Sequence, residues 1–186
     1  MLWLAVEEKP ALAFSTSEST LLPLKSLVLS ADELDSEFGS FSDVFTVSYD
    51  ATNELENFCF NDCAKTVWSS PTGDKLTITM IRLANSEDAQ KSIQNLWQIF
   101  QSLGNIFYPS DKLTEEDNSW SGVALYSKDK FQYVACKTQG PVLVFISYHK
   151  FLRYFMADVD SGEYISRVEL TASAQQQKLK TAGYSP

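Results

Sequence analysis

Basic residues, histidine and long apolar runs are all scarce in this sequence, and each scarcity excludes a class of function. There are 15 bases against 24 acids, a net charge of −9. No cluster of Lys or Arg interleaved with aromatic residues is present, so we expect no nucleic-acid binding. No apolar run approaches the roughly 18 residues of a membrane-spanning helix, so we expect a soluble chain without a transmembrane segment. The glycine-rich loops that hold nucleotides are also missing.

The shortage of bases is local. No base lies between Lys25 and Lys65, and the rest of the chain balances at 15 acids against 15 bases. The interval holds nine acids: Asp32, Glu33, Asp35, Glu37, Asp43, Asp50, Glu54, Glu56 and Asp62. It predicts an acidic patch that discourages anionic partners and steers a basic one. The calcium-binding loop of EF-hands is not found in it, and we predict no metal site.

The three cysteines do not decide whether the protein is cytoplasmic or extracytoplasmic. Cys59 and Cys63 have the spacing of a small disulfide loop, of two ordinary thiols, or of half a metal site. The metal interpretation lacks a second ligand pair, because the only histidine lies 86 positions further on. A disulfide would indicate an extracytoplasmic compartment, and free thiols a cytoplasmic one. The apolar start, residues 1–6, is too short for a signal-peptide core, and a trimmed chain would look the same.

The length predicts a single domain over residues 23–186, preceded by a polar lead-in over residues 1–22 whose ordering is doubtful. The strongest periodicity is helical, over residues 86–103, with Asn85 as its N-cap, and a shorter helix over 31–38 has Ser30 as its N-cap. Further helices are expected at 151–158 and 162–181. Strands are expected at 23–29, 44–49, 64–68, 76–83, 122–126, 131–138 and 142–148.

This order of elements predicts the α+β class: a single antiparallel sheet of five to seven strands, with the long amphipathic helix and the C-terminal helices packed largely on one face. The last three strands follow one another too closely for parallel pairing. Strands 131–138 and 142–148 are apolar on both faces, so both faces need cover from helices of this chain or from a second subunit. A homodimer is therefore an open alternative.

No catalytic residue is predicted. His149 is the only imidazole, and its candidate nucleophile is Cys136 on the neighbouring strand. A turn at residues 139–140 would place Cys136 opposite Leu143 and His149 opposite Lys130, roughly 20 Å apart. Pairs of carboxylates carry no specificity in a chain with 24 acids. We expect no enzyme and no cofactor.

Aromatic residues are the best candidates for a binding site between the 86–103 helix and the sheet. They are Trp68, Trp97, Phe107, Tyr108, Trp120 and Tyr126. Trp97 fits plain core equally well, whereas Trp120 lies in a polar stretch, predicted to be a loop, where it would act as a lid or contact a partner. We therefore predict a non-enzymatic binding or interaction domain for an unknown protein partner, acting through a sheet face or this loop. The alternative is a carrier of a small apolar ligand or lipid, with its pocket between helix and sheet.

Overall fold

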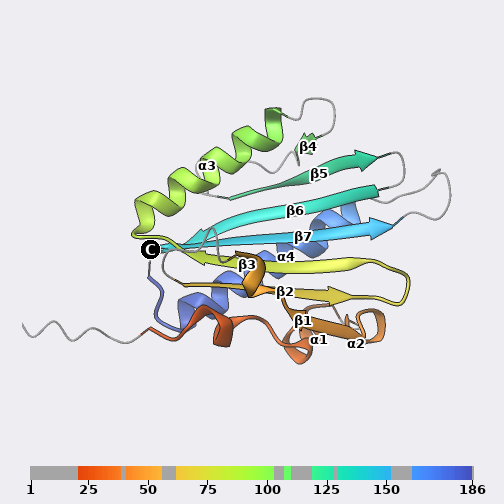
Figure 1. Ribbon diagram of the computed structural model, residues 1–186, viewed down its shortest axis with the longest axis horizontal. Helices are drawn as coiled ribbons and strands as arrows, with labels where there is room; N and C mark the ends of the chain where they lie inside the picture. Colours follow the sequence, from red (N-terminus) through yellow and green to blue (C-terminus); the bar gives the residue numbers. More distant parts are fainter. Residues whose placement is uncertain are drawn as a thin grey trace, which may run out of the picture.

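The computed structural model describes residues 21–38, 41–55, 62–102, 107–109, 119–127, 130–151 and 161–185. Seven strands form one antiparallel sheet in the order β1-β2-β3-β7-β6-β5-β4 (Figure 1). The strands are β1 Val47–Asp50, β2 Asp62–Ser69, β3 Lys75–Arg82, β4 Phe107–Pro109, β5 Ser119–Ser127, β6 Lys130–Gln139 and β7 Val142–Phe151. The helices are α1 Ala31–Phe38, α2 Phe41–Val44, α3 Ser86–Ser102 and α4 Ser161–Thr181, with 3-10 turns η1 Leu24–Leu27 and η2 Thr52–Leu55. The predicted α+β class and single antiparallel sheet are confirmed.

Local hydrogen bonds explain where the predicted helices begin. At α1, the Glu33 N–H donates to Ser30 Oγ at 3.3 Å, and the Ser30 N–H donates to the Glu33 carboxylate at 2.7 Å. This reciprocal pair is a capping box. At α3, the Asp88 N–H donates to Asn85 Oδ1 at 2.8 Å. Both N-caps are therefore the residues that the sequence predicts.

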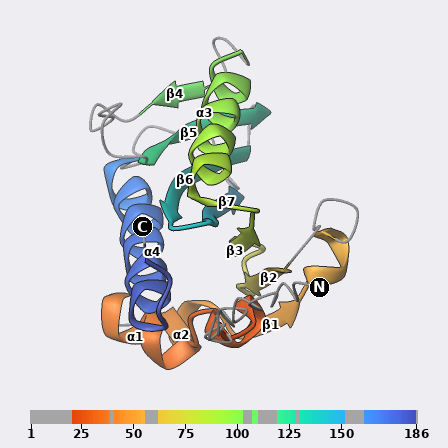
Figure 2. The same ribbon diagram turned by 90° about the vertical axis from the view of Figure 1, so that its left-hand side faces the viewer.

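The helices cover opposite faces of the sheet, which corrects the prediction that they pack largely on one face. Figures 1 and 2 show α4 on one side of the strands, together with α1 and α2, and α3 on the other. Tyr133 of β6 and Val144 of β7 belong to the core beneath α4, whereas Val134 and Leu143 belong to the core beneath α3. Because both strands are apolar on both faces, each face needs its own cover, and helices of this chain supply it.

Two further elements differ from the sequence prediction. The segment expected as an edge strand at 23–29 contains the 3-10 turn η1, and its backbone is hydrogen-bonded by the side chain of Gln175 in α4. The short strand β4 was not predicted. Residues 1–20 and 152–160 lie outside the described residues, so most of the predicted lead-in and of the predicted 151–158 helix stays a prediction. Phe151, the expected first residue of that helix, is instead the last residue of β7. Within the described part of the chain, no helix is both long and apolar enough to span a membrane.

The negative charge of the acidic interval, residues 26–64, is partly neutralised by Lys and Arg side chains. Within the described part of the chain, four acids of this interval form ion pairs: Asp50 with Lys25 at 2.5 Å, Asp62 with Arg82 at 2.9 Å, Glu33 with Lys178 at 2.7 Å, and Glu54 with Lys65. Hydrogen bonds from Lys25 and Thr52 hold the pKa of Asp50 well below its usual range. The excess of acids along the chain therefore does not become one uniform acidic surface.

Candidate functional site

Trp97 and Trp120 are the two predicted binding residues that the fold brings together. Their ring centroids are 5.8 Å apart, and the Trp120 indole N–H donates to the backbone carbonyl of Ile93 at 3.1 Å. Trp120 lies in strand β5 and is only 6% exposed, so the predicted loop with a lid or partner-binding tryptophan is wrong. The ring packs between α3 and the sheet as core.

The remaining predicted aromatic residues do not join this pair. Trp68 lies on the opposite sheet face, where its ring meets Phe41 edge-on at 5.3 Å. The side chains of Phe107, Tyr108 and Tyr126 lie outside the described residues.

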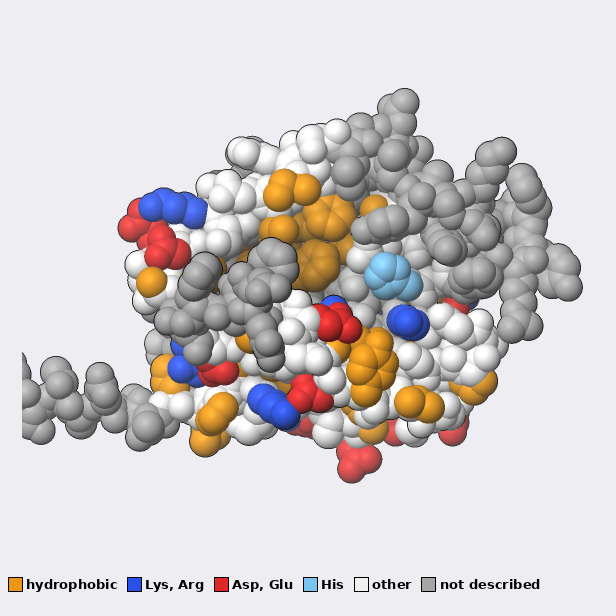
Figure 3. All heavy atoms as spheres, viewed as in Figure 1, with side chains coloured by type: hydrophobic (Ala, Val, Ile, Leu, Met, Phe, Trp, Pro, Cys, Tyr) orange, Lys and Arg blue, Asp and Glu red, His pale blue; other side chains and the backbone are white. Residues whose placement is uncertain are grey.

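The α3 face itself is filled by rings, with Phe100 5.1 Å from Trp120 and 6.1 Å from Phe145. Figure 3 shows apolar side chains gathered over this side of the sheet, beside α3. The helix–sheet contact proposed for an apolar ligand is thus occupied by the chain's own aromatic residues.

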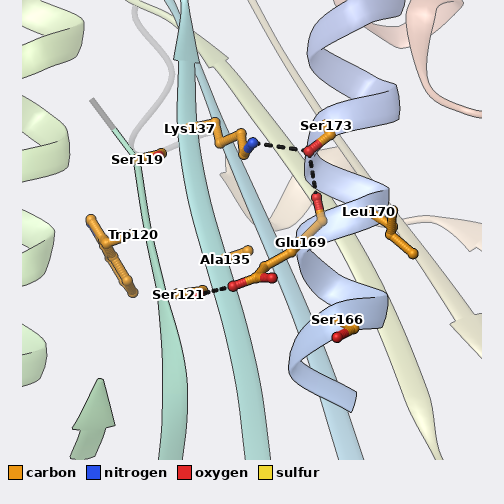
Figure 4. A pocket seen from close by; sticks show the side chains of 9 residues that line it. All are labelled: Ser119, Trp120, Ser121, Ala135, Lys137, Ser166, Glu169, Leu170 and Ser173. Carbon is orange, nitrogen blue, oxygen red and sulfur yellow. Dashed lines mark hydrogen bonds between the residues drawn. The ribbon is translucent and has the colours of Figure 1, made fainter. Parts of the chain in front are cut away.

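A cleft of about 420 Å³ opens on the other face of the sheet, between α4 and strands β5 and β6 (Figure 4). It is lined by Ser119, Trp120 and Ser121 of β5, Ala135 and Lys137 of β6, and Ser166, Glu169, Leu170 and Ser173 of α4. In Figure 4 the Trp120 ring points away from the cleft, toward α3. The cleft side chains are therefore mostly small and polar.

Strand alternation and helix periodicity explain why these residues meet. Ser119 pairs with Lys137 and Ser121 with Ala135, so these four residues share the α4 face of adjacent strands. The four α4 residues recur at helical spacing and lie on one side of the helix. The small side chains of serine and alanine leave space at this end of the sheet. Tyr133, two residues before Ala135 on the same face of β6, instead fills the core with its large ring.

Hydrogen bonds hold the two charged groups of the cleft apart. The Ser121 hydroxyl donates to the Glu169 carboxylate at 2.6 Å. The Lys137 ammonium donates to Ser173 Oγ at 2.9 Å, and the Ser173 hydroxyl in turn donates to the backbone carbonyl of Glu169 at 2.8 Å. Among the described residues, no carboxylate lies within 4.0 Å of the Lys137 nitrogen. The cleft therefore has a cationic end near Ser119 and an anionic end near Ser121 (Figure 4).

The cysteine and histidine of β6 and β7 do not form a catalytic pair. Cys136 pairs with Phe145 and His149 with Gln132, two residues away from the predicted register, because the hairpin loop is Gly140–Pro141. The two residues lie four positions apart along the strands, about 14 Å. Cys136 is fully buried, which raises the pKa of its thiol well above its ordinary value. Burial and the nearby Lys75 and Lys65 lower the pKa of His149.

Sequence reasoning missed the cleft residues, and the available signals explain why. The pattern Ser119-Trp120-Ser121 has the polarity of a loop, but its serines face the cleft and its tryptophan faces the core. Nothing in the sequence indicates that α4 lies above this strand. Within the described ranges, no group of three or more histidine, cysteine or acidic side chains is placed to hold a metal.

Comparisons with known proteins identify the fold and no more. No family model matches the chain, and no curated protein matches its sequence. Among solved structures, the chain is similar to the extracellular domain of PknH from Mycobacterium tuberculosis, with 9% identity and a TM-score of 0.53. The likeness covers 84% of this chain and 94% of that domain. At so low an identity, this is a likeness of fold alone.

Proposed function

We propose that this chain is a non-enzymatic binding domain that takes a small polar ligand in the cleft between α4 and strands β5 and β6. The observation that carries this proposal is the convergence of Lys137, Glu169 and four serines, from three elements, on one cleft. Its volume of about 420 Å³ lies within the roughly 300–1,000 Å³ typical of ligand sites. Serine hydroxyls both donate and accept hydrogen bonds, so they suit a ligand with polar groups along its length.

The same cleft disfavours the alternative of an apolar ligand or lipid. Such a ligand would remove water from Lys137 and Glu169 without replacing its hydrogen bonds, which is costly for charged groups. The aromatic contact beneath α3, where that alternative placed its pocket, is filled by the rings of Trp97, Phe100 and Trp120. A polar ligand on the α4 face is the better fit.

Two contacts support the non-enzymatic part of the proposal. Lys137 donates to Ser173, whose own proton goes to the backbone carbonyl of Glu169. The Ser173 hydroxyl is therefore not directed at a base that would activate it as a nucleophile. The Ser121 hydroxyl donates to the Glu169 carboxylate, but no imidazole is among the residues that line the cleft. His149 faces the opposite side of the sheet, as its partner Gln132 alternates with Tyr133 of the α4-side core.

The domain with the similar fold is extracellular in PknH. We propose the same kind of setting for this chain, where a ligand would reach the cleft from outside the cell. In an oxidising compartment Cys59 and Cys63 would be able to form the predicted disulfide.

The proposal is tested by screening sugars, amino acids, hydroxy acids and medium-chain fatty acids against the ¹⁵N-labelled protein by NMR. We expect polar compounds to shift the amides of the cleft residues in β5, β6 and α4. Leu170→Trp adds bulk at the cleft and should weaken binding at least tenfold. Ile99→Trp is the matched control, because both residues are exposed helical aliphatics, 45% and 57% exposed, and Ile99 lies on α3.

Three outcomes would overturn the proposal. In the first, only fatty acids bind. In the second, the amide shifts are centred on α3. In the third, no compound shifts the amides of the cleft residues. Equal affinity of Leu170→Trp and the wild type would likewise place the binding site elsewhere.

A further inference from the structure

We infer that the ligand of this cleft is a hydroxylated organic acid, such as a sugar acid, and that Lys137 and Ser119 recognise its carboxylate. This inference rests on the proposed function and names the class of ligand. It starts from Lys137, the only base that lines the cleft among the described residues. The remaining steps follow from what surrounds that ammonium.

The Lys137 ammonium has more N–H donors than hydrogen bonds to described residues. An ammonium carries three N–H groups. Lys137 is half-buried and makes one hydrogen bond within the described structure, to Ser173 Oγ at 2.9 Å. A half-buried charge is most stable with an opposite charge beside it, and a neutral hydroxyl only partly fulfils that role. A bound carboxylate would complete the coordination of this group.

Ser119 supplies a second donor at the same end of the cleft. It lies directly opposite Lys137 in the β5–β6 pair, where Cβ atoms of facing residues are about 4.5–5.5 Å apart. Its hydroxyl makes no hydrogen bond to another described residue. Figure 4 shows Ser119, Lys137 and Ser173 together at one end of the cleft. The Lys137 side chain extends from this position toward Ser173, so the ammonium and the Ser119 hydroxyl border the same end of the cleft from its α4 and β5 sides. A ligand carboxylate at this end has both donors beside it.

The charge balance favours a carboxylate over a phosphate. A phosphate monoester carries a charge of about −1.5 to −2 at neutral pH. It would meet a single ammonium here, in a cleft that also holds the Glu169 carboxylate and in a chain of net charge −9. A single carboxylate matches the single ammonium.

The other end of the cleft favours hydroxyl groups on the same ligand. Glu169 accepts a hydrogen bond from Ser121 at 2.6 Å, and its carboxylate lines this end of the cleft. The exposed hydroxyl of Ser166 also lines the cleft. Ligand hydroxyls can donate to the carboxylate and exchange hydrogen bonds with the serine, whereas a second ligand carboxylate would be repelled there.

The test compares glucuronate with glucose, which differ by the carboxylate, and with inorganic phosphate, by NMR titration of the full chain. We expect glucuronate to bind at least tenfold more tightly than glucose. Lys137→Gln should remove this preference, so that the variant binds glucuronate and glucose with affinities within about twofold of each other. Lys150→Gln is the matched control: Lys150 is also a half-buried lysine bonded to a hydroxyl, that of Tyr164, and it is not among the cleft residues. It should keep the preference.

A second variant keeps the inference testable if Lys137→Gln does not fold. Ser119→Ala removes one hydroxyl and should weaken glucuronate binding severalfold, and by a larger factor than it weakens glucose binding. Equal binding of glucose and glucuronate at the cleft, or tighter binding of phosphate, would overturn the inference and leave the proposed function standing. If no compound in the wider screen binds at the cleft, the proposed function itself is wrong.

Discussion

Gly140 lies where the β6–β7 hairpin meets the C-terminal segment. Its φ is +54°, in the left-handed region that favours glycine. A Cβ built on it would lie 2.1 Å from the backbone oxygen of Ser185. Gly73, in the β2–β3 turn, also has a positive φ, of +91°, but a Cβ there would meet nothing within 4 Å. A substitution at Gly73 therefore introduces backbone strain alone, whereas one at Gly140 adds steric overlap with Ser185.

We therefore expect Gly140→Ala to destabilise the protein more than Gly73→Ala. Backbone strain alone should lower the free energy of unfolding by about 1–2 kcal/mol at Gly73. At Gly140 the overlap with Ser185 should cost roughly 2 kcal/mol more, because backbone must move. Urea unfolding of the two variants measures the difference. Equal losses would indicate that the C-terminal segment moves aside at no cost.

Trp120 shows, at the same scale, how a residue can be misplaced by its neighbours. Serines on either side made the stretch resemble a loop, and a tryptophan in a loop suggested a binding residue. In the strand the serines face the cleft and the ring faces α3. The polarity that suggested a loop belongs instead to the candidate site.

At the scale of elements, α4 holds the segment that follows η1 through one buried amide. Gln175 is fully buried, accepts a hydrogen bond from the Leu29 N–H at 3.1 Å, and donates to the Leu27 carbonyl at 2.8 Å. These two bonds take the place of the strand neighbour that residues 23–29 were expected to have. The segment is thereby linked to a helix about 150 residues further along the chain.

Gln175→Leu tests this link. The change leaves the N–H of Leu29 and the carbonyl of Leu27 without partners, and each buried orphan costs about 1–3 kcal/mol. We expect the free energy of unfolding to fall by about 2–4 kcal/mol, measured by chemical denaturation. The control is Gln177→Leu, on an exposed position of the same helix, which should change stability by less than about 0.5 kcal/mol. A Gln175→Leu protein as stable as the wild type would contradict this account.

At the scale of the whole molecule, the predicted disulfide concerns the compartment. Cys59 lies outside the described residues, so its pairing with Cys63 stays a prediction. Cys136 is a free cysteine, and burial keeps its thiol protonated and inaccessible. The three cysteines are thus expected to respond differently to alkylation.

Iodoacetamide labelling followed by mass spectrometry distinguishes them in protein made under oxidising conditions. We expect no label in the native protein, one label after unfolding without reductant, and three after unfolding with reductant. The variant Cys136→Ala should then carry no label without reductant. Three labels on the wild type without reductant would show that Cys59 and Cys63 are thiols, contrary to the prediction.

The homodimer alternative rested on apolar strands that needed cover on both faces. Within the described residues, α3 and α4 lie against those two faces, so a second subunit is not needed for that purpose. The predicted acidic patch changes in a similar way, because Lys25, Lys65, Arg82 and Lys178 pair with four of its acids. Both features depend on elements that lie far apart in the sequence.

The sequence by itself determined the local structure: the helix at residues 86–102 with its cap, the hairpin of β2 and β3, the meander of β5 to β7, and hence the α+β class. These follow from side-chain periodicity, caps and turns, which involve residues a few positions apart. The tertiary structure alone decided that α3 and α4 cover opposite faces, that β7 pairs with β3, and that Lys137 faces the serines of α4. Those outcomes depend on the packing of distant elements, and a pattern along one element specifies its apolar face but not which element covers it.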